Sequence, residues 1–251
     1  MEVIAIINQK GGVGKSTTAL AIGSGLRNQG FKVLFIDLDA QGNLSYTIGA
    51  TTQSYNALGI LQRPETTKEE IQRTAQGDII ASSPALAGAD NILIDVGKEY
   101  KLKESLETVS GLYDYCIIDT PPALSILTIN ALTSCNSVII PAQADIYSLQ
   151  GIGQLNNTIQ TIKKYCNPTL SIKGIILTRY NSRSVLSKEV TELIEQTASE
   201  LNTKVFNTKI RECTALKEAQ AMKQDIFTYA PKSNASADYS EIIRELLKKE
   251  Q

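Results

Sequence analysis

The fold is decided by residues 3–17, which read VIAIINQKGGVGKST. The apolar, β-branched run Val3–Ile7 predicts a buried strand, and the segment Ser16–Gln29 that follows the glycines predicts a helix. Glycines let the connecting loop turn back so that successive N–H groups point at phosphate oxygens, and the helix N-terminus adds its positive end. The stretch therefore predicts a phosphate-binding loop formed by Lys10, Gly11, Gly12, Val13, Gly14, Lys15, Ser16 and Thr17.

Two side chains of this loop would carry its chemistry. Lys15 can reach the β- and γ-phosphates of a nucleotide, and the Ser16 hydroxyl can bind Mg²⁺. The common pattern G-x-x-x-x-G-K-[ST] is not met, because Gln9 stands at its first glycine. The loop instead fits K-G-G-x-G-K-[ST], in which Lys10 is an additional lysine.

Outside the loop, strands and helices alternate along the chain. Further short β-branched runs predict parallel strands at Val33–Ile36, Cys116–Ile118, Val138–Ile140 and Ile172–Leu177. Helices are predicted at Ile126–Ser134, Leu149–Tyr165 and Ser187–Leu201, and Thr51–Tyr100 predicts short helices with one short strand. Such alternation is typical of an α/β fold with a doubly wound, mostly parallel sheet flanked by helices. We expect one such domain over residues 1–251.

Composition excludes several other classes of protein. The chain has no histidine, and its four cysteines form no Cys-x-x-Cys pair, which argues against a zinc site and favours reduced thiols in a cytoplasmic protein. Met1 and Glu2 lead directly into Val3–Ile7, a run too short for a signal-peptide core or a membrane span.

The phosphate loop resembles that of the deviant Walker-A ATPases, a family that includes the ParA/Soj partition proteins, MinD and the nitrogenase iron protein. Asp37–Asn43 (DLDAQGN) is similar to the family's second motif, and Tyr113–Pro122 (YDYCIIDTPP) is similar to its Walker-B strand. Pro141–Gln143 ends the next predicted strand as the family does. The Gln-Gly-Asn and Thr-Pro-Pro variants favour the ParA/Soj branch.

The resemblance implies an Mg²⁺-dependent ATPase in which Lys10, Lys15 and Asp39 are catalytic. Ser16 would bind Mg²⁺, Asp119 would hold an Mg²⁺-bound water, and Asp37 would support the same coordination shell. Asp39 lies two residues beyond Asp37, so both side chains should leave the strand end on one side, near the attacking water. The alternative for Asp39 is a helix N-cap.

Dimerisation is also implied by the resemblance. Lys10 would cross a homodimer interface to the partner's nucleotide, and ATP would drive this association. Thr178 and Arg179 match the place where relatives contact the adenine base. The family often has Ile-Pro-Arg where this chain has Ile210–Glu212 (IRE), which leaves the second wall of the base pocket open.

Charge separates the possible partners. Residues 1–162 carry 10 basic and 15 acidic residues, whereas residues 163–251 carry 15 and 11, and no acidic residue lies between Asp145 and Glu189. This bias indicates either a solvated helical face or a surface for a polyanion. In the partition reading, the ATP dimer binds DNA non-specifically on the nucleoid, and a cargo-bound ParB-like protein activates it. The candidate DNA contacts are Arg183, Lys188, Lys204 and Lys217.

Two other readings compete with partition. A MinD-like ATPase would bind membranes through Tyr239–Gln251, which is amphipathic but has a nearly neutral polar face, so we expect a packed terminal helix instead. An electron-transfer protein like the nitrogenase iron protein would need two cysteines in exposed loops. Cys116 falls inside a predicted strand, which argues against a cluster.

Overall fold

The computed structural model describes residues 1–53 and 56–248. Within them, seven strands form one sheet in the order β3-β4-β2-β5-β1-β6-β7. All neighbouring strands are parallel except β3 and β4. The strands are β1 (Glu2–Ile6), β2 (Val33–Asp37), β3 (Gln72–Thr74), β4 (Gly77–Ile80), β5 (Tyr115–Asp119), β6 (Ser137–Ala142) and β7 (Ser171–Leu177). The predicted α/β fold with a mostly parallel sheet is confirmed.

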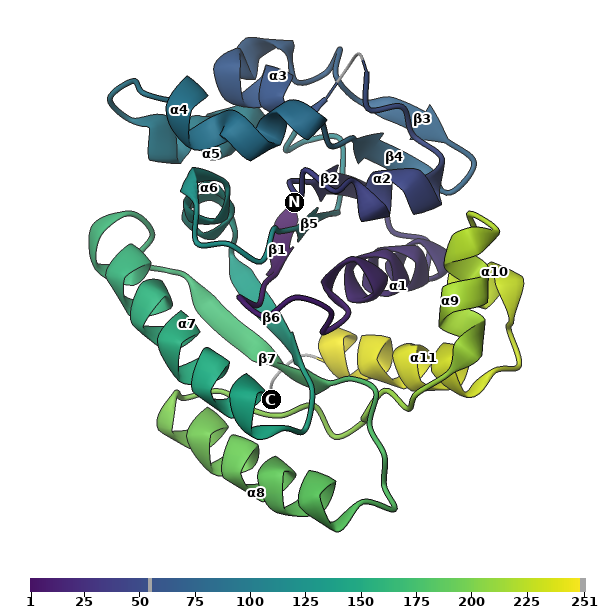
Figure 1. Cartoon of the computed structure of the whole chain (residues 1–251). Coiled ribbons are helices and arrows are strands. Elements are labelled where there is room, and N and C mark those ends of the chain that lie inside the picture. Colours follow the sequence, from purple (N-terminus) through teal and green to yellow (C-terminus); the bar gives the residue numbers. More distant parts are fainter. Residues whose placement is uncertain (54–55, 249–251) are drawn as a thin grey trace.

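Helices cover both faces of this sheet (Figure 1). One face carries α1 (Lys15–Asn28), α2 (Asn43–Ile48), α9 (Thr214–Ala221), α10 (Ile226–Tyr229) and α11 (Asn234–Leu247). The other face carries α3 (Ala57–Gln62), α4 (Ala89–Ile92), α5 (Lys101–Glu107), α6 (Ile126–Ser134), α7 (Ile146–Tyr165) and α8 (Val185–Glu200). Short 3₁₀ turns lie at Pro64–Thr66, Pro84–Gly88 and Lys98–Tyr100. Each face therefore has its own hydrophobic core, as a doubly wound sheet requires.

The segment between residues 51 and 100 differs from the prediction in one respect. It contributes two strands, β3 and β4, rather than one. They form an antiparallel hairpin, and Gly77 begins β4 with a φ of 138°. The sequence of β3, Gln-Arg-Thr, is polar and only three residues long, so it carries no alternation of apolar and polar residues.

The terminal helix α11 packs against the domain as expected. Tyr239, Ile242 and Ile243 are buried, and the hydroxyl of Tyr239 shares a hydrogen bond of 3.1 Å with Thr18 of α1. The C-terminal end of the predicted segment, residues 249–251, lies outside the described residues. No helix among the described residues is long and apolar enough to span a membrane.

Strand register positions the functional residues. Asp37 ends β2 and Asp119 ends β5, and the two are direct register partners. Ile6 of β1 pairs with Asp119 on its other side, so the chain leaves β1 for the glycine-rich loop beside these two carboxylates. Because parallel strands end at the same edge, the topology brings three sequence motifs to one place.

Candidate nucleotide site

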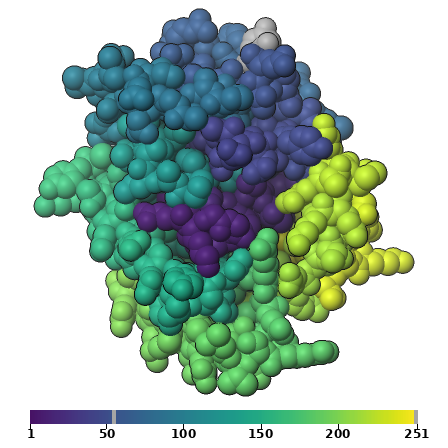
Figure 2. Space-filling model, in the orientation of Figure 1, coloured from purple at the N-terminus to yellow at the C-terminus, as the bar shows by residue number. Residues whose placement is uncertain are grey.

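The glycine-rich loop joins β1 to α1 at the carboxyl edge of the sheet. Gly12 has a φ of 75° and Gly14 a φ of 89°, both in the left-handed region that glycine adopts without strain. Gly14 is the N-cap residue of α1, and its carbonyl accepts a hydrogen bond from Thr18 N–H at 2.8 Å. This part of the chain (purple) reaches the surface between the blue-teal segments and the yellow-green C-terminal segment in Figure 2.

A cleft of about 470 Å³ lies over this loop. It is lined by Gly11, Gly12, Gly14, Lys15, Ser16, Thr17, Asp39, Asn43, Tyr46, Thr47, Pro122, Arg179, Gln220 and Ala221. The loop, the second motif and the residues after β5 thus meet in one cavity. A Cβ added at Gly11 or Gly12 would meet no atom within 4 Å, so the loop is open on that side.

Lys15 is buried at the base of the cleft. Its ammonium donates to the Lys10 carbonyl at 3.3 Å. Burial lowers the pKa of Lys15, whereas the charges of Asp119 and Asp39 raise it and only partly offset the burial. A phosphate group in the cleft would supply the negative charge that this partly desolvated ammonium lacks.

Asp119 is fully buried, and among residues 1–53 and 56–248 no group donates a well-formed hydrogen bond to either of its carboxylate oxygens. Burial raises the pKa of Asp119 well above its usual value, and the charge of Asp37 adds to the effect. The nearby Ser16 hydroxyl and Lys15 act in the opposite direction. Because an unpartnered buried carboxylate is costly, its two open oxygens beside Ser16 fit a hard cation such as Mg²⁺.

Asp37 is equally buried but its oxygens are engaged. Oδ2 accepts hydrogen bonds from Ser45 N–H at 2.8 Å and from Ser45 Oγ at 2.7 Å, and Oδ1 accepts from Asp39 N–H at 3.1 Å. Burial raises the pKa of Asp37 to about 6, and these hydrogen bonds counteract part of the rise. Asp37 therefore fixes the loop that presents Asp39, and Ser45 is a partner that the sequence analysis did not identify.

Asp39 lines the cleft beside Lys15 and Ser16, as expected from its spacing to Asp37. Its Oδ1 accepts a hydrogen bond from Gln41 N–H at 3.0 Å. The N-cap of α2 is Gly42, so Asp39 is not the N-cap of this helix.

Lys10 points away from the base of the cleft. Its ammonium lies 2.7 Å from Oδ2 of Asp145, and 5.9 Å from the centroid of the Tyr147 ring. Burial raises the pKa of Asp145, but the hydrogen bonds from Lys10 and Ser148 outweigh it and leave that pKa below its usual value. Sequence reasoning did not find this partner, which lies 135 residues away.

A second, smaller pocket adjoins the cleft and includes Thr178 and Arg179, the two residues expected to contact the base. Thr178 and Arg179 form one wall, and the Thr178 hydroxyl donates to the Val13 carbonyl at 2.8 Å. The opposite wall comes from residues 210–220 and Tyr239. It includes Ile210, Arg211, Glu212, Cys213, Leu216, Lys217 and Gln220.

The part of this wall where the family often has Ile-Pro-Arg, residues 210–212, is held by an ion pair. The Arg211 guanidinium donates to both carboxylate oxygens of Asp238, at 3.0 and 2.6 Å, and Arg211 N–H donates to the same group at 3.0 Å. Gln220 donates to the Thr17 hydroxyl at 2.7 Å, which ties α9 to the phosphate loop. These contacts hold the wall that lies opposite Thr178 and Arg179.

The four candidate DNA contacts do not lie together. Arg183 lies just before α8 and Lys188 in its first turn, and both are exposed. Lys217 lines the smaller pocket, whereas Lys204 lies beside β7 at the edge of the sheet.

The four cysteines differ in burial. Cys116 and Cys135 are buried, and burial raises the pKa of Cys135 to about 12. Cys166 and Cys213 are half-buried.

Two family models match this chain. The model described as an AAA domain matches residues 1–172, and that of the 4Fe-4S iron sulfur cluster binding proteins of the NifH/frxC family matches residues 128–251. The second match leaves out the phosphate loop and covers less than half of the chain.

Two known proteins are similar in sequence over nearly the full length of this chain. The sporulation initiation inhibitor protein Soj of Bacillus subtilis is 38% identical over 250 residues, which cover 98% of each chain. The chromosome partitioning protein ParA of Myxococcus xanthus is 34% identical over 254 residues, covering 99% of this chain and 88% of that one.

A solved structure has the same fold. Cobyrinic acid a,c-diamide synthase from Mycobacterium smegmatis, with a bound ATP analogue and magnesium, superposes with a TM-score of 0.85 at 32% identity, covering 99% of this chain and 95% of that one. Phosphate loop, second motif and Walker-B strand all converge on one cleft, and the similarity to Soj and ParA runs over nearly the full length. The chain therefore belongs to the ParA/Soj branch of the deviant Walker-A ATPases.

Proposed function

We propose that this chain is an Mg²⁺-dependent ATPase whose ATP state is a homodimer that binds DNA without sequence preference and positions a cargo. The observation that carries the proposal is the buried Asp119 carboxylate, whose two unpartnered oxygens lie beside Ser16 and Lys15. ATP hydrolysis is transfer of a phosphoryl group to water, so the protein must hold charge and place a nucleophile.

Each group of the cleft has a role in that reaction. The loop N–H groups and Lys15 bind the phosphates, and Asp39 orients the attacking water. Ser16 and Asp119 would hold Mg²⁺, with Asp37 supporting that site through Ser45 and the Asp39 loop. The ion would neutralise charge that develops on the phosphate oxygens.

Dimerisation would complete the site. Lys10 is held by Asp145 in the single chain, and both side chains remain about one third exposed. A partner's nucleotide would offer Lys10 more negative charge than one carboxylate does, so the lysine would exchange Asp145 for phosphate oxygens. Tyr147 and Ile146 are exposed next to this pair and supply apolar surface for the contact.

DNA binding would then depend on nucleotide. The exposed Arg183 and Lys188 stand at the start of α8, and a dimer would present each of them twice. Each phosphate that a protein neutralises contributes about −0.9 to the slope of log affinity against log salt on duplex DNA. Doubling the number of phosphate contacts would therefore raise the affinity for DNA and make it fall more steeply with salt. We infer that a ParB-like protein bound to the cargo stimulates hydrolysis and releases the dimer from the nucleoid.

The test is binding of a random-sequence duplex with ATP, ADP or no nucleotide. We expect tight binding of the duplex only when ATP is present. The variant Arg183→Gln/Lys188→Gln should bind the duplex more weakly, and its affinity should depend less on salt. The matched control Lys68→Gln/Lys103→Gln removes two exposed charges from the other half of the chain. Equal binding with ATP and ADP, or equal loss in both variants, would contradict the proposal.

Anionic liposomes separate partition from a MinD-like function. The apolar face of α11 is buried, with Ile242 and Ile243 at most 3% exposed, so this face is not available to a membrane. We expect no nucleotide-dependent sedimentation with liposomes. Preference of the ATP form for liposomes over DNA would favour membrane positioning.

A further inference from the structure

Arg179 has a backbone conformation that is uncommon for a residue with a side chain. Its φ is 49°, in the left-handed region where the Cβ meets steric resistance. Among the described residues, Asn202 and Lys223 are the other two non-glycine residues with a positive φ. Each of these two directly follows the C-cap of a helix, where left-handed residues are common. Arg179 ends no helix but lies two residues beyond β7, so other contacts must hold its backbone.

Hydrogen bonds on both sides of Arg179 fix this conformation. The Thr178 hydroxyl donates to the Val13 carbonyl of the phosphate loop at 2.8 Å. On the other side, Tyr180 N–H donates to the Ile210 carbonyl at 2.9 Å. Thr178 is buried, whereas Arg179 is exposed. The chain is therefore tied to the phosphate loop just before Arg179 and to residue 210 just after it.

Arg179 lines both cavities of the candidate nucleotide site. It belongs to the cleft of about 470 Å³ over the phosphate loop and also to the smaller pocket beside it. The described residues that both cavities share are Gly14, Thr17, Arg179 and Gln220, and Arg179 alone among them carries a charge. In a nucleotide, the ribose and the α-phosphate join the base to the β- and γ-phosphates. With the base in the smaller pocket and the outer phosphates at Lys15, the α-phosphate would lie where the two cavities meet.

The cleft offers few positive charges to an anionic ligand. Among its described lining residues, Lys15 and Arg179 are the cationic ones, and Asp39 opposes them. Lys10 is held by Asp145 instead. Arg179 forms no ion pair within residues 1–53 and 56–248, so none has to break when a phosphate binds it. A guanidinium also donates through a planar fork that matches phosphate oxygens.

We propose that Arg179 binds the α-phosphate of the nucleotide held by its own chain. Because the contact needs a bound nucleotide, it rests on the proposed function, and it replaces the base contact that the family resemblance implies for this residue. Hydrolysis breaks the bond to the γ-phosphate, so the charge on the α-phosphate changes little in the transition state. Arg179 therefore stabilises the ground state and the transition state equally, which lowers KM and leaves kcat unchanged.

The experiment is a calorimetric titration of ADP with Mg²⁺ into the full chain, at low and at moderate salt. ADP contains the α-phosphate, and its binding does not require the dimer. Arg179→Met should weaken ADP binding about tenfold, because a hydrogen-bonded charge contact is lost. The affinity of this variant should also depend less on salt. Arg179→Lys keeps the charge and should recover most of the affinity.

Methionine separates a phosphate contact from packing on the base. Its unbranched stem can still cover an adenine ring, but it carries no charge. In turnover assays, Arg179→Met should raise KM for ATP about tenfold with kcat unchanged. Normal ADP affinity in Arg179→Met, with the usual dependence on salt, would overturn the phosphate contact while the proposed function stands. If the wild-type chain binds no ADP, the proposed function fails and the contact fails with it.

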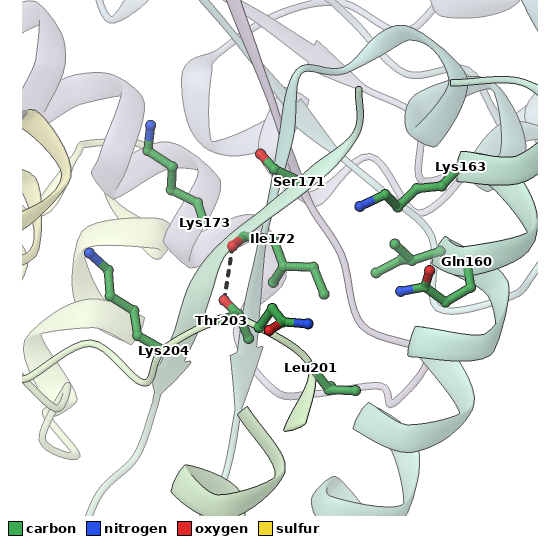
Figure 3. A pocket seen from close by; sticks show the side chains of 10 residues that line it. Gln160, Lys163, Ser171, Ile172, Lys173, Leu201, Thr203 and Lys204 are labelled. Carbon is green, nitrogen blue, oxygen red and sulfur yellow. Dashed lines mark hydrogen bonds between the residues drawn. The ribbon is translucent and has the colours of Figure 1, made fainter. Parts of the chain in front are cut away.

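Lys163→Met is the matched control for the loss of one positive charge. Lys163 is half-buried and extends from α7 at the cavity of about 540 Å³ beside the amino end of β7 (Figure 3). Arg179 follows the carboxyl end of the same strand, so the two residues lie at opposite ends of it. ADP affinity in Lys163→Met should stay within about twofold of the wild type. Equal weakening in Arg179→Met and Lys163→Met would mean a general effect of net charge and would overturn the contact.

Arg179→Gly separates the contact from damage to the fold. Glycine adopts a φ of 49° without steric resistance, so this variant should unfold at a higher urea concentration than Arg179→Met. It should nevertheless bind ADP as weakly as Arg179→Met does, because both lack the guanidinium. ADP affinity that followed stability across these variants would show a structural role for Arg179 and would overturn the proposal.

Discussion

The ammonium of Lys10 lies 2.7 Å from the carboxylate of Asp145, so the lysine expected to act on a partner's nucleotide is held by its own chain. Asp145 is also the N-cap of α7, because its side chain accepts from Ser148 N–H at 2.8 Å. One carboxylate thus anchors a helix and restrains the lysine.

Removing Lys10 should separate ATP binding from dimerisation. Lys10→Ala should bind ATP as a monomer but neither dimerise nor turn over, because the charge supplied in trans is lost. Analytical ultracentrifugation with a slowly hydrolysed ATP analogue measures this. A normal dimer with normal turnover would remove the role in trans.

Asp145→Asn should have the opposite effect on association. Asparagine still caps α7, so the helix keeps its start, while Lys10 loses its ion pair. An ion pair with this exposure contributes about 0–1 kcal/mol, so the dimer should tighten by no more than about fivefold. A weaker ATP dimer in this variant would show that Asp145 helps the associated state instead.

Asp39→Ala should bind ATP and dimerise yet hydrolyse at least about a hundredfold more slowly, because the attacking water is no longer placed. Lys15→Ala should instead lose nucleotide binding, since the loop loses its charge on the phosphates. Turnover and nucleotide affinity are measured for both. If Asp39→Ala loses ATP affinity as Lys15→Ala does, Asp39 is structural.

The stability of the nucleotide-free chain should fall as pH rises from about 5.5 to 7.5. Burial raises the pKa of Asp37 to about 6 and that of Asp119 well above its usual value. A carboxyl whose folded pKa is raised binds its proton more tightly in the folded state. Its contribution to stability is therefore full below the unfolded-state pKa and is lost as pH rises through the folded-state pKa. The chain has no histidine to titrate in this window.

Chemical denaturation across this pH range tests the effect, with Asp119→Asn as the comparison. The Ser16 hydroxyl is the hydrogen-bonding group that favours the ionised Asp119, and asparagine keeps an oxygen that can face it, so the variant should be more stable at pH 7.5 and show a shallower slope. Identical slopes in the two proteins would show that Asp119 is ionised throughout.

The ion pair between Arg211 and Asp238 should set ATP affinity rather than the chemical step. Arg211→Met should raise KM by several-fold with kcat unchanged, because the base-pocket wall loosens and the phosphate cleft stays intact. Arg244→Met is the control, since Arg244 pairs with Glu241 on the exposed side of α11. A fall in kcat, or the same KM in both variants, would argue against this positioning role.

Gly25 should be required for the packing of α1 against α11. A Cβ at this position would lie 1.8 Å from Cδ1 of Ile243, so Gly25→Ala should cost about 1–3 kcal/mol in the free energy of unfolding. Gly153→Ala on the exposed side of α7 meets nothing within 4 Å and should be neutral or stabilising. Urea denaturation of both variants measures the difference.

Sequence reasoning reached the features that depend on local patterns. Short β-branched runs predicted the central strands, and Ile126–Ser134 was predicted with the bounds that α6 has. The phosphate loop and Asp39 were found because their spacing carries the chemistry. The polar strand β3 was not found, since a three-residue edge strand has no hydrophobic signal.

The missed parts of the site are contacts between distant residues. Asp145 meets Lys10 because β6 lies beside β1, and Arg211 meets Asp238 because the loop before α9 passes the N-terminal part of α11. No spacing in the sequence predicts either pair, because each contact depends on the path that a loop takes after it leaves the sheet.

The central place of β1 in the sheet has a consequence during translation. Both of its neighbours, β5 and β6, begin more than a hundred residues later in the chain. At roughly 5–20 residues per second, a ribosome needs on the order of ten seconds to supply them. For that interval the nascent chain displays an apolar strand with two unpaired edges, a template for aggregation between neighbouring polysomes. Slow elongation before Tyr115 would lengthen this exposure. Chaperones should therefore bind nascent chains most often while those chains are still too short to include β5.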